Sequence, residues 1–536
     1  MAAPEVDALR SQLRDRGYLS HGIERWFALD PWSSRAFWVE LAVVALKAAT
    51  LIASFAALPH VAVMLLRNGR LSTVETLLLF AVYAAFWFAV SFTFVVIVAL
   101  LVKIRPELAV DTPRALLAIS IAASAMLAVP IVIWWFRFDA LPTPLELAIG
   151  GVLGALFFVV TAIVISAALL SFSIYELQRI PAIHQRSRTI PLAAGAAALV
   201  ALLFVPARGT SEPATPPPQI ITRPSETRFA LVAVDGLTWD IAQSRPALLQ
   251  PFVSSFPLAS ASGPSAAERW ASLGTGVPSQ FHGVRALAGV RLAGGNRVLQ
   301  SISRADFLLR DVAPAMGIAR IQPLPPTVRR RHFVWESLAA RGVPVVAVNW
   351  WTSSSEKSGA LTSIGQETIF GASQGEPLRL DGAAFRRLQS AVGESNPRFA
   401  TVYLPALDVI LNRLDADRST QLAQSLRAMD GVSETVQWLR GQAYEVLLIG
   451  IAGEGQSGQG VLASTIALEK PESSWDVAPT VAELAGFPAS EEMPGRSAVK
   501  TSQPRIATYG ERSRTESATR LNQEYYESLR SLGYIR

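Results

Sequence analysis

The first part of the chain is dominated by long apolar runs separated by short polar loops. About 20 apolar residues in a helix span the hydrocarbon core of a bilayer, with roughly 17 to 25 tolerated. Most of the runs meet that length, and five buried helices of a soluble protein would leave little surface to solvate. The pattern therefore predicts about five transmembrane helices within residues 36–206. The runs lie at Phe37–Leu66, Thr76–Val102, Ala115–Phe136, Leu145–Ile174 and Ile190–Val205.

Arginine and lysine residues predict how these helices are oriented. They are abundant in residues 1–35 and in the loops at 103–114 and 179–188, and sparser in the loops between them. Loops rich in these residues face the cytoplasm. We therefore expect a multi-pass protein of the plasma or inner membrane, with a cytoplasmic N-terminal segment and an extracytoplasmic C-terminal part. Residues 1–35 are polar and amphipathic, so we do not expect them to be a signal peptide.

The pattern changes after residues 207–227, a Pro-rich spacer that predicts an extended linker. Short β-branched runs then alternate with helix-like stretches, and each run is almost continuously apolar. Strands of parallel sheets that are covered on both faces have this pattern. We predict one α/β domain over residues 228–536, with a mainly parallel sheet between helices. The predicted strands are Phe229–Val234, Val343–Val348, Phe399–Leu404, Val446–Ile451 and Val461–Ile466.

Charge and composition exclude some classes of function. The net charge of +6 would suit nucleic-acid binding, but many arginines flank the apolar runs instead of forming one patch. We therefore expect no nucleic-acid partner. The chain has no cysteine, which excludes disulfides and cysteine-ligated zinc. Few charges lie within the apolar runs, which makes a transporter a less favoured alternative.

Acidic residues follow two of the predicted strands. The first strand ends in Val234-Asp235-Gly236, and the third runs on to Asp408. Ligands of open α/β sheets bind at the carboxyl ends of the strands, so two carboxylates there fit a metal or catalytic site. Aspartates are also common in turns and helix caps. The spacing alone leaves both interpretations open.

Several segments of residues 228–536 match a known family in collinear order. They are Leu231–Asp240, Trp270–Gly276 with Phe281–Val284, Phe333–Leu338 with Val345–Trp351, Asp476–Gly486 with Met493–Arg496, and Leu529–Tyr534. Together they resemble the type I phosphodiesterase/nucleotide pyrophosphatase branch of the alkaline phosphatase superfamily. The resemblance implies an alkaline-phosphatase-like, sulfatase-like fold.

The resemblance also implies a site with two divalent metals, often zinc, that activate a Thr or Ser nucleophile. Asp235 and Asp408 match two of the expected metal ligands. The remaining positions of the site have lost the expected residue type. They are Ala266 for the nucleophile, and Asn412, Ile451, Ala452 and Gln456 for metal ligands. Ser265, next to Ala266, is a weak candidate for the nucleophile.

Histidines are too few to rebuild that site. After the spacer the chain has only His282 and His332, and neither falls on a ligand position. We therefore expect no cofactor, although Asp235 and Asp408 could still hold an oxygen-ligated cation such as Mg²⁺ or Ca²⁺. The Gly453–Gly460 segment is glycine-rich. This composition predicts either a flexible loop or a loop whose backbone N–H groups bind an anion. Arg329–Arg331 reads as a solvated face or as a contact for anionic lipid.

The sequence supports three hypotheses about function. The one we favour is a pseudoenzyme: a membrane-anchored, phosphatase-like domain that binds a protein partner or an anionic ligand, anionic lipid included, without catalysis. The second is an active hydrolase or transferase that acts on phosphate or related esters at the membrane surface with zinc or an oxygen-ligated cation. The third is a transporter-like membrane protein. The residues alone leave open whether the chain is an enzyme.

Overall fold

The computed structural model describes residues 35–69, 71–104, 113–137, 143–178, 225–259, 265–373, 376–500, 503–512 and 523–534, apart from positions 296, 301 and 304, together with short pieces within residues 8–16. The chain forms two compact units. Apolar helices make up the first, and most of the second is the chain that follows residue 206. The predicted linker 207–227 and the predicted fifth helix at Ile190–Val205 lie almost wholly outside the described residues.

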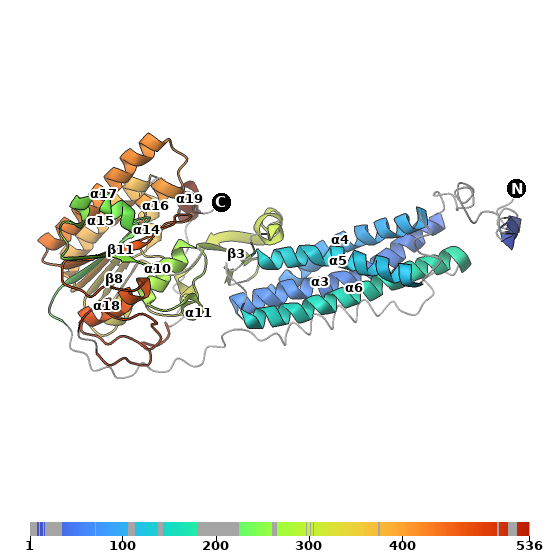
Figure 1. Ribbon diagram of the computed structural model, residues 1–536, viewed down its shortest axis with the longest axis horizontal. Helices are drawn as coiled ribbons and strands as arrows, with labels where there is room; N and C mark the ends of the chain where they lie inside the picture. Colours follow the sequence, from blue (N-terminus) through green and yellow to red (C-terminus); the bar gives the residue numbers. More distant parts are fainter. Residues whose placement is uncertain are drawn as a thin grey trace. The chain divides into compact units, whose positions relative to one another are not determined.

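Four long helices form most of the described part of the first unit (Figure 1). All four are long and apolar enough to cross a membrane. Their outer surfaces carry large apolar side chains, such as the exposed Met126, Phe136 and Val152, which suit lipid better than water. Four of the predicted membrane helices are thus present. They are α3 (Arg35–Asn68), α4 (Thr73–Ile104), α5 (Pro113–Phe136) and α6 (Pro144–Gln178).

An eight-stranded sheet forms the centre of the second unit, in the order β2-β11-β10-β1-β9-β6-β8-β7. The five strands from β10 to β8 are parallel, and β11, β2 and β7 are antiparallel at the two edges. This is the mainly parallel sheet that the sequence predicts. The strands are β1 (Phe229–Asp235), β2 (Ser254–Leu258), β6 (Val345–Val348), β7 (Glu356–Ser358), β8 (Leu361–Ile364), β9 (Phe399–Leu404), β10 (Glu445–Ile451) and β11 (Gly460–Ser464).

Helices cover both faces of this sheet. Figure 1 shows α15 and α17 on one side and α10 and α18 on the other. Every residue of β1, β6 and β9 is buried, as expected for strands between two helical layers. The helices that the site uses are α10 (Ala266–Thr275), α11 (Ser279–His282), α13 (Val334–Ala339), α15 (Pro377–Ser395), α16 (Ala406–Asn412), α17 (Arg418–Gly441), α18 (Val477–Leu484) and α19 (Gln523–Ser531).

A second, small antiparallel sheet has the order β4-β3-β5. Its strands are β3 (Ala288–Leu292), β4 (Val298–Leu299) and β5 (Ala319–Pro323), and a short helical turn that includes Leu308–Val312 precedes β5. The sequence pattern did not predict this sheet. Strands this short, with glycine and arginine among their residues, give no clear two-residue alternation.

Candidate functional site

The two predicted carboxylates lie together at the carboxyl edge of the central sheet. Asp235 is the last residue of β1, and Asp408 lies in the first turn of α16, just after β9, which pairs with β1. Their chain segments touch, because a Cβ atom built on Gly236 would lie 2.7 Å from the backbone nitrogen of Asp408. Both aspartates are fully buried. The structure therefore brings together the pair on which the predicted metal site depended.

Asp235 lies in an environment that disfavours its charge. Burial raises the pKa of the Asp235 carboxyl, and the negative charge of Asp408 raises it further, although Arg269 acts in the opposite direction. The Tyr403 hydroxyl donates a hydrogen bond of 2.8 Å to Asp235 Oδ2. Together these effects raise the pKa of Asp235 to about 7.

Asp408 is surrounded by hydrogen-bond donors from the protein itself. Asn412 Nδ2 donates to Oδ1 at 2.8 Å, the Glu454 backbone N–H donates to the same oxygen at 3.1 Å, and Arg413 Nε donates to Oδ2 at 2.8 Å. Both carboxylate oxygens are thus engaged, and the charge of Asp408 is balanced by a guanidinium. Asn412 stands where the family resemblance expects a metal-binding histidine, and here it is a donor to the aspartate.

Arg413 is a residue of this site that the sequence did not reveal. Its side chain is only 4% exposed and is held from three sides. Besides Asp408, it contacts Glu454 Oε2 at 2.8 Å, and its guanidinium carbon lies 4.0 Å from the centre of the Tyr534 ring. Its position directly after the lost histidine was the one available signal, but a single arginine beside a polar residue reads as an ordinary surface group.

Two of the lost ligand positions are now part of the apolar core. Ile451 ends β10 and lies beside Asp235 in the parallel ladder, and Ala452 follows it. Both are buried. Neither side chain has a lone pair, so no rearrangement of the loop can make either of them a metal ligand.

The fourth lost position, Gln456, shapes the glycine-rich loop instead of facing Asp408. Its side-chain oxygen accepts a hydrogen bond of 2.7 Å from the Gly453 backbone N–H. Gly453 itself packs against the site, and a Cβ atom at this position would overlap Asp408 Oδ1. The loop therefore closes directly over the carboxylate, and the absence of a side chain at Gly453 permits this close approach.

Ser265, the weak candidate for a nucleophile, caps a helix. Its hydroxyl accepts a hydrogen bond from the Glu268 backbone N–H at 3.1 Å and donates one to the Arg285 carbonyl at 3.1 Å. Ala266 is the first residue of α10 and is fully buried. The nearby His282 forms a hydrogen bond with Ser272, with 2.9 Å between Nε2 and Oγ. The two hydrogen bonds of Ser265 thus serve the start of α10, as in many helix caps.

A cavity of about 620 Å³ opens at this edge of the sheet. One side is polar and belongs to the site already described. The other side is formed by the small sheet and the chain around it, where aliphatic side chains lie together with Gln300, Arg310 and Asp311. The lining includes Ser265, Asn412, Arg413, Glu454 and Tyr534 on the polar side, and Leu287, Val290, Ile302 and Ile321 on the other side.

The residues at this edge do not fit the two divalent metals that the family resemblance implies. Within the part of the chain that the structure describes, no group of three or more His, Asp or Glu side chains converges as metal ligands would. The donors around Asp408 are N–H groups, which repel a cation. The chemistry of the donor set, and not the sequence alone, therefore disagrees with a two-metal site.

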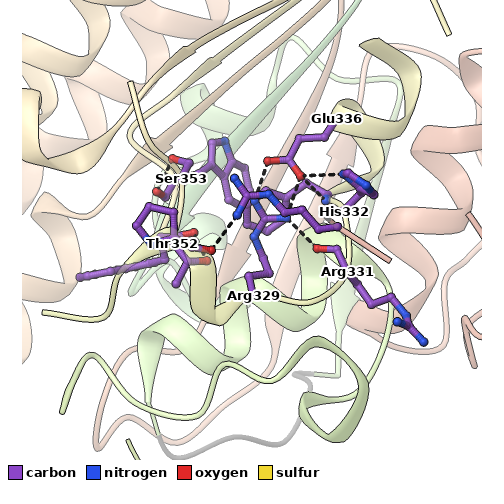
Figure 2. A network of polar contacts seen from close by, with 11 residues as sticks. Arg329, Arg331, His332, Glu336, Thr352 and Ser353 are labelled. Atoms are coloured by element: carbon purple, nitrogen blue, oxygen red, sulfur yellow. Dashed lines mark hydrogen bonds and ion pairs between the residues drawn. The ribbon is translucent and has the colours of Figure 1, made fainter. Parts of the chain in front are cut away.

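Arg329 and Arg331, from the basic run Arg329–Arg331, are both paired with carboxylates, and Figure 2 shows the network around Arg329 and Glu336. Arg329 is buried and forms a bidentate pair with Glu336 on α13, at 2.5 and 2.7 Å. Arg331 pairs with Glu492 at 2.9 Å and with Glu511 at 2.7 Å. Both interpretations of this run from the sequence, a solvated face and a lipid contact, are therefore wrong for Arg329, which is buried, whereas Arg331 is partly exposed. Their charges are already paired inside the domain.

Comparisons with known proteins gave matches among solved structures alone. No family model and no curated protein matches the chain. It is similar to murine ectonucleotide pyrophosphatase/phosphodiesterase 5 in complex with AMP, with 11% identity and a TM-score of 0.30 over 42% of this chain and 56% of that one. It is also similar to a putative sulfatase from Bacteroides thetaiotaomicron, with 12% identity and a TM-score of 0.35 over 53% of this chain and 77% of that one.

The two neighbours are thus a nucleotide pyrophosphatase/phosphodiesterase and a putative sulfatase. The chain spans just over half the length of the pyrophosphatase it matches. Because the identities are low and the TM-scores are below 0.5, function has to be inferred from the residues of this chain.

Proposed function

We propose that the protein is a membrane-anchored, alkaline-phosphatase-like pseudoenzyme. Its extracytoplasmic domain binds a protein partner or an anionic ligand at the carboxyl edge of the sheet and does not hydrolyse phosphate esters. The observation that carries this proposal is the state of Asp408, whose two oxygens are taken by Arg413, Asn412 and the Glu454 backbone.

A guanidinium can balance the charge of Asp408, but it cannot do the chemistry of a metal. A catalytic metal has an open position where a bound water loses its proton near neutral pH, and paired metals stabilise both the attacking and the leaving oxygen. Arginine stays protonated and has no such position. The site therefore keeps the charge balance of a metal-bound carboxylate and lacks the means to make a nucleophile.

The membrane helices support the anchored part of the proposal. Four helices long and apolar enough to cross a membrane precede the α/β domain. The excess of Arg and Lys in residues 1–35 and in two of the following loops favours a cytoplasmic N-terminus, and the fifth crossing predicted at Ile190–Val205 would then put the domain outside the membrane.

The test is a metal analysis and a phosphodiesterase assay on the purified full-length protein. We expect no stoichiometric zinc and no hydrolysis of a simple aryl phosphodiester above a protein-free blank, with or without added divalent cations. We also expect Ser265→Ala to change nothing in that assay. Turnover that is abolished both by a chelator and by Asp235→Ala would contradict the proposal and favour an active metal-dependent hydrolase or transferase.

A further inference from the structure

Arg413 has two carboxylate partners, one buried and one half-exposed. Its pair with Asp408 is buried on both sides, with side chains 4% and 0% exposed, and breaking such a pair leaves an uncompensated charge. Its pair with Glu454 is different, because the Glu454 side chain is 51% exposed. Water solvates the Glu454 carboxylate, which weakens this pair, so the carboxylate can leave while the pair with Asp408 stays in place.

The backbone lets Glu454 leave without opening the site. Its N–H stays on Asp408 Oδ1, which fixes the start of the loop. The following residues include Gly455 and Gly458, with φ of +78° and +131°, conformations that glycine adopts without strain. Rotation of the Glu454 side chain alone is therefore enough to expose one edge of the Arg413 guanidinium to the cavity.

The opposite wall of the cavity suits an apolar group. Leu287, Val290, Ile302 and Ile321 line it, and Val290 and Ile321 are cross-strand neighbours on β3 and β5. A cavity of about 620 Å³ also lies within the range of roughly 300–1,000 Å³ that is typical of small-molecule sites. A ligand that fills this space would meet Arg413 at one side and aliphatic side chains at the other, with the oppositely charged Arg310 and Asp311 also in the lining.

We propose that this cavity binds an anionic amphiphile, whose single anionic group displaces Glu454 from Arg413 and whose apolar part lies against the wall formed by Leu287, Val290, Ile302 and Ile321. This inference deepens the proposed function, on which it rests, by naming the class of ligand at the same site. The monoanion would take the place of the Glu454 carboxylate at the guanidinium, and the half-exposed Glu454 side chain would turn toward solvent.

Glu454 is thus a built-in competitor of the ligand, and its removal should strengthen binding. The experiment uses the full-length protein in phosphatidylcholine nanodiscs, with octanoate as the probe and calorimetric titration as the readout. We expect Glu454→Gln to raise the affinity for octanoate by about two- to fivefold, the range that the strength of an exposed ion pair sets. Acetate lacks the apolar part and octanol lacks the charge, so both should bind much more weakly.

Two variants make the result specific. Glu376→Gln breaks an exposed pair with Arg379 elsewhere on the domain and should leave the affinity for octanoate unchanged. Ile321→Asn alters the apolar wall and should weaken octanoate binding without the loss of folding that a change at Arg413 risks. No gain with Glu454→Gln, or an equal gain with Glu376→Gln, would overturn the inference.

The source of the amphiphile is distinguished by a second arm. Nanodiscs that contain phosphatidylglycerol offer the same chemistry on a lipid, and a larger thermal stabilisation of Glu454→Gln than of the wild type in these discs would identify the membrane as the source. A gain with octanoate alone would identify a free amphiphile. Phosphodiesterase activity measured on the same samples tests the proposed function separately, because turnover would contradict the pseudoenzyme without altering the octanoate result.

Discussion

At the scale of single residues, the decisive feature is an arginine at the place where the resemblance expects a metal ion. Asp408 remains buried where the family resemblance expects a metal ligand, and a buried carboxylate needs a compensating charge. Arg413 supplies that charge. The buried ion pair with Arg413 thus provides at Asp408 the charge balance that the resemblance would assign to a metal.

Removal of Arg413 should destabilise the α/β domain strongly. We expect Arg413→Gln to cost about 3–5 kcal/mol, because it leaves Asp408 buried and unpaired. Arg245→Gln, which breaks an exposed pair with Asp430, should cost at most about 1 kcal/mol. The apparent Tm of the full-length protein in detergent measures both. Addition of Asp408→Asn to Arg413→Gln should restore much of the lost stability. If the double variant has the same Tm as Arg413→Gln alone, the arginine acts through other contacts.

His282 should make stability depend on pH. Its pKa is lowered to about 3, first by burial and then by Arg329 and Arg285. Val284 N–H donates to Nδ1 at 3.1 Å, so the folded ring is neutral. A histidine of lowered pKa stabilises the fold above its unfolded pKa near 6.5, and that contribution is lost as the pH falls from there toward 3.

The measurement compares the wild type with His282→Asn, which cannot titrate. The advantage of the wild type should be largest at pH 7.5 and should shrink by about 2 kcal/mol at pH 5, as judged from the apparent Tm at each pH. The comparison cancels the opposite contribution of Asp235, whose pKa is raised. An advantage of the same size at both pH values would rule out the titration of His282.

The sequence was informative about some of these residues and silent about others. Asp235 and Asp408 could be predicted as neighbours because each follows a parallel strand, and such strands end at one edge of a sheet. The role of Arg413 in the site and the pairing of Arg329 could not be predicted from the sequence. Their partners come from other parts of the chain or from a helix whose orientation the sequence does not give. Local patterns identify the strands but not which charges the fold will bury.

At the scale of elements, the glycine-rich loop between β10 and β11 has replaced the metal-binding loop that the resemblance implies. It begins against Asp408 and is held by Gln456 and by the Glu454 backbone. The interpretation of this segment as an unstructured, flexible loop was therefore incomplete, because its first residues are fixed by the site. The small β4-β3-β5 sheet, which the sequence did not reveal, adds the wall that turns this edge of the domain into a cavity.

Gly453 should tolerate no side chain. Its backbone φ is not left-handed, so an alanine there is allowed by the backbone, but its Cβ would overlap Asp408 Oδ1. We expect Gly453→Ala to cost about 1–3 kcal/mol through displacement of the loop. Gly431→Ala is the matched control, because it lies inside α17 with open space around it and should stabilise the helix by about 0.5–1 kcal/mol. Equal apparent Tm values for the two variants would contradict the close packing of the loop.

At the scale of the whole molecule, the sequence divides into two halves that obey different physical rules. The first unit exposes large apolar side chains, whereas the second buries its apolar residues around a sheet. Helix length and strand pattern predicted both units because each depends on local periodicity. Orientation depends instead on the distribution of Arg and Lys in the loops, which leaves no trace in the packing of either unit and has to be measured.

The topology has a direct test in the full-length chain. A cytoplasmic N-terminus with five membrane crossings predicts that a reporter fused at residue 185 is cytoplasmic and that one fused after residue 208 is extracytoplasmic, because the run Ile190–Val205 would cross between them. Paired alkaline phosphatase and green fluorescent protein fusions report the two sides with opposite signals. The same side at both positions would remove the fifth crossing. If four helices then place residue 208 in the cytoplasm, the α/β domain and its cavity would face the cytoplasm, and the amphiphile bound beside Arg413 would have to come from the inner leaflet.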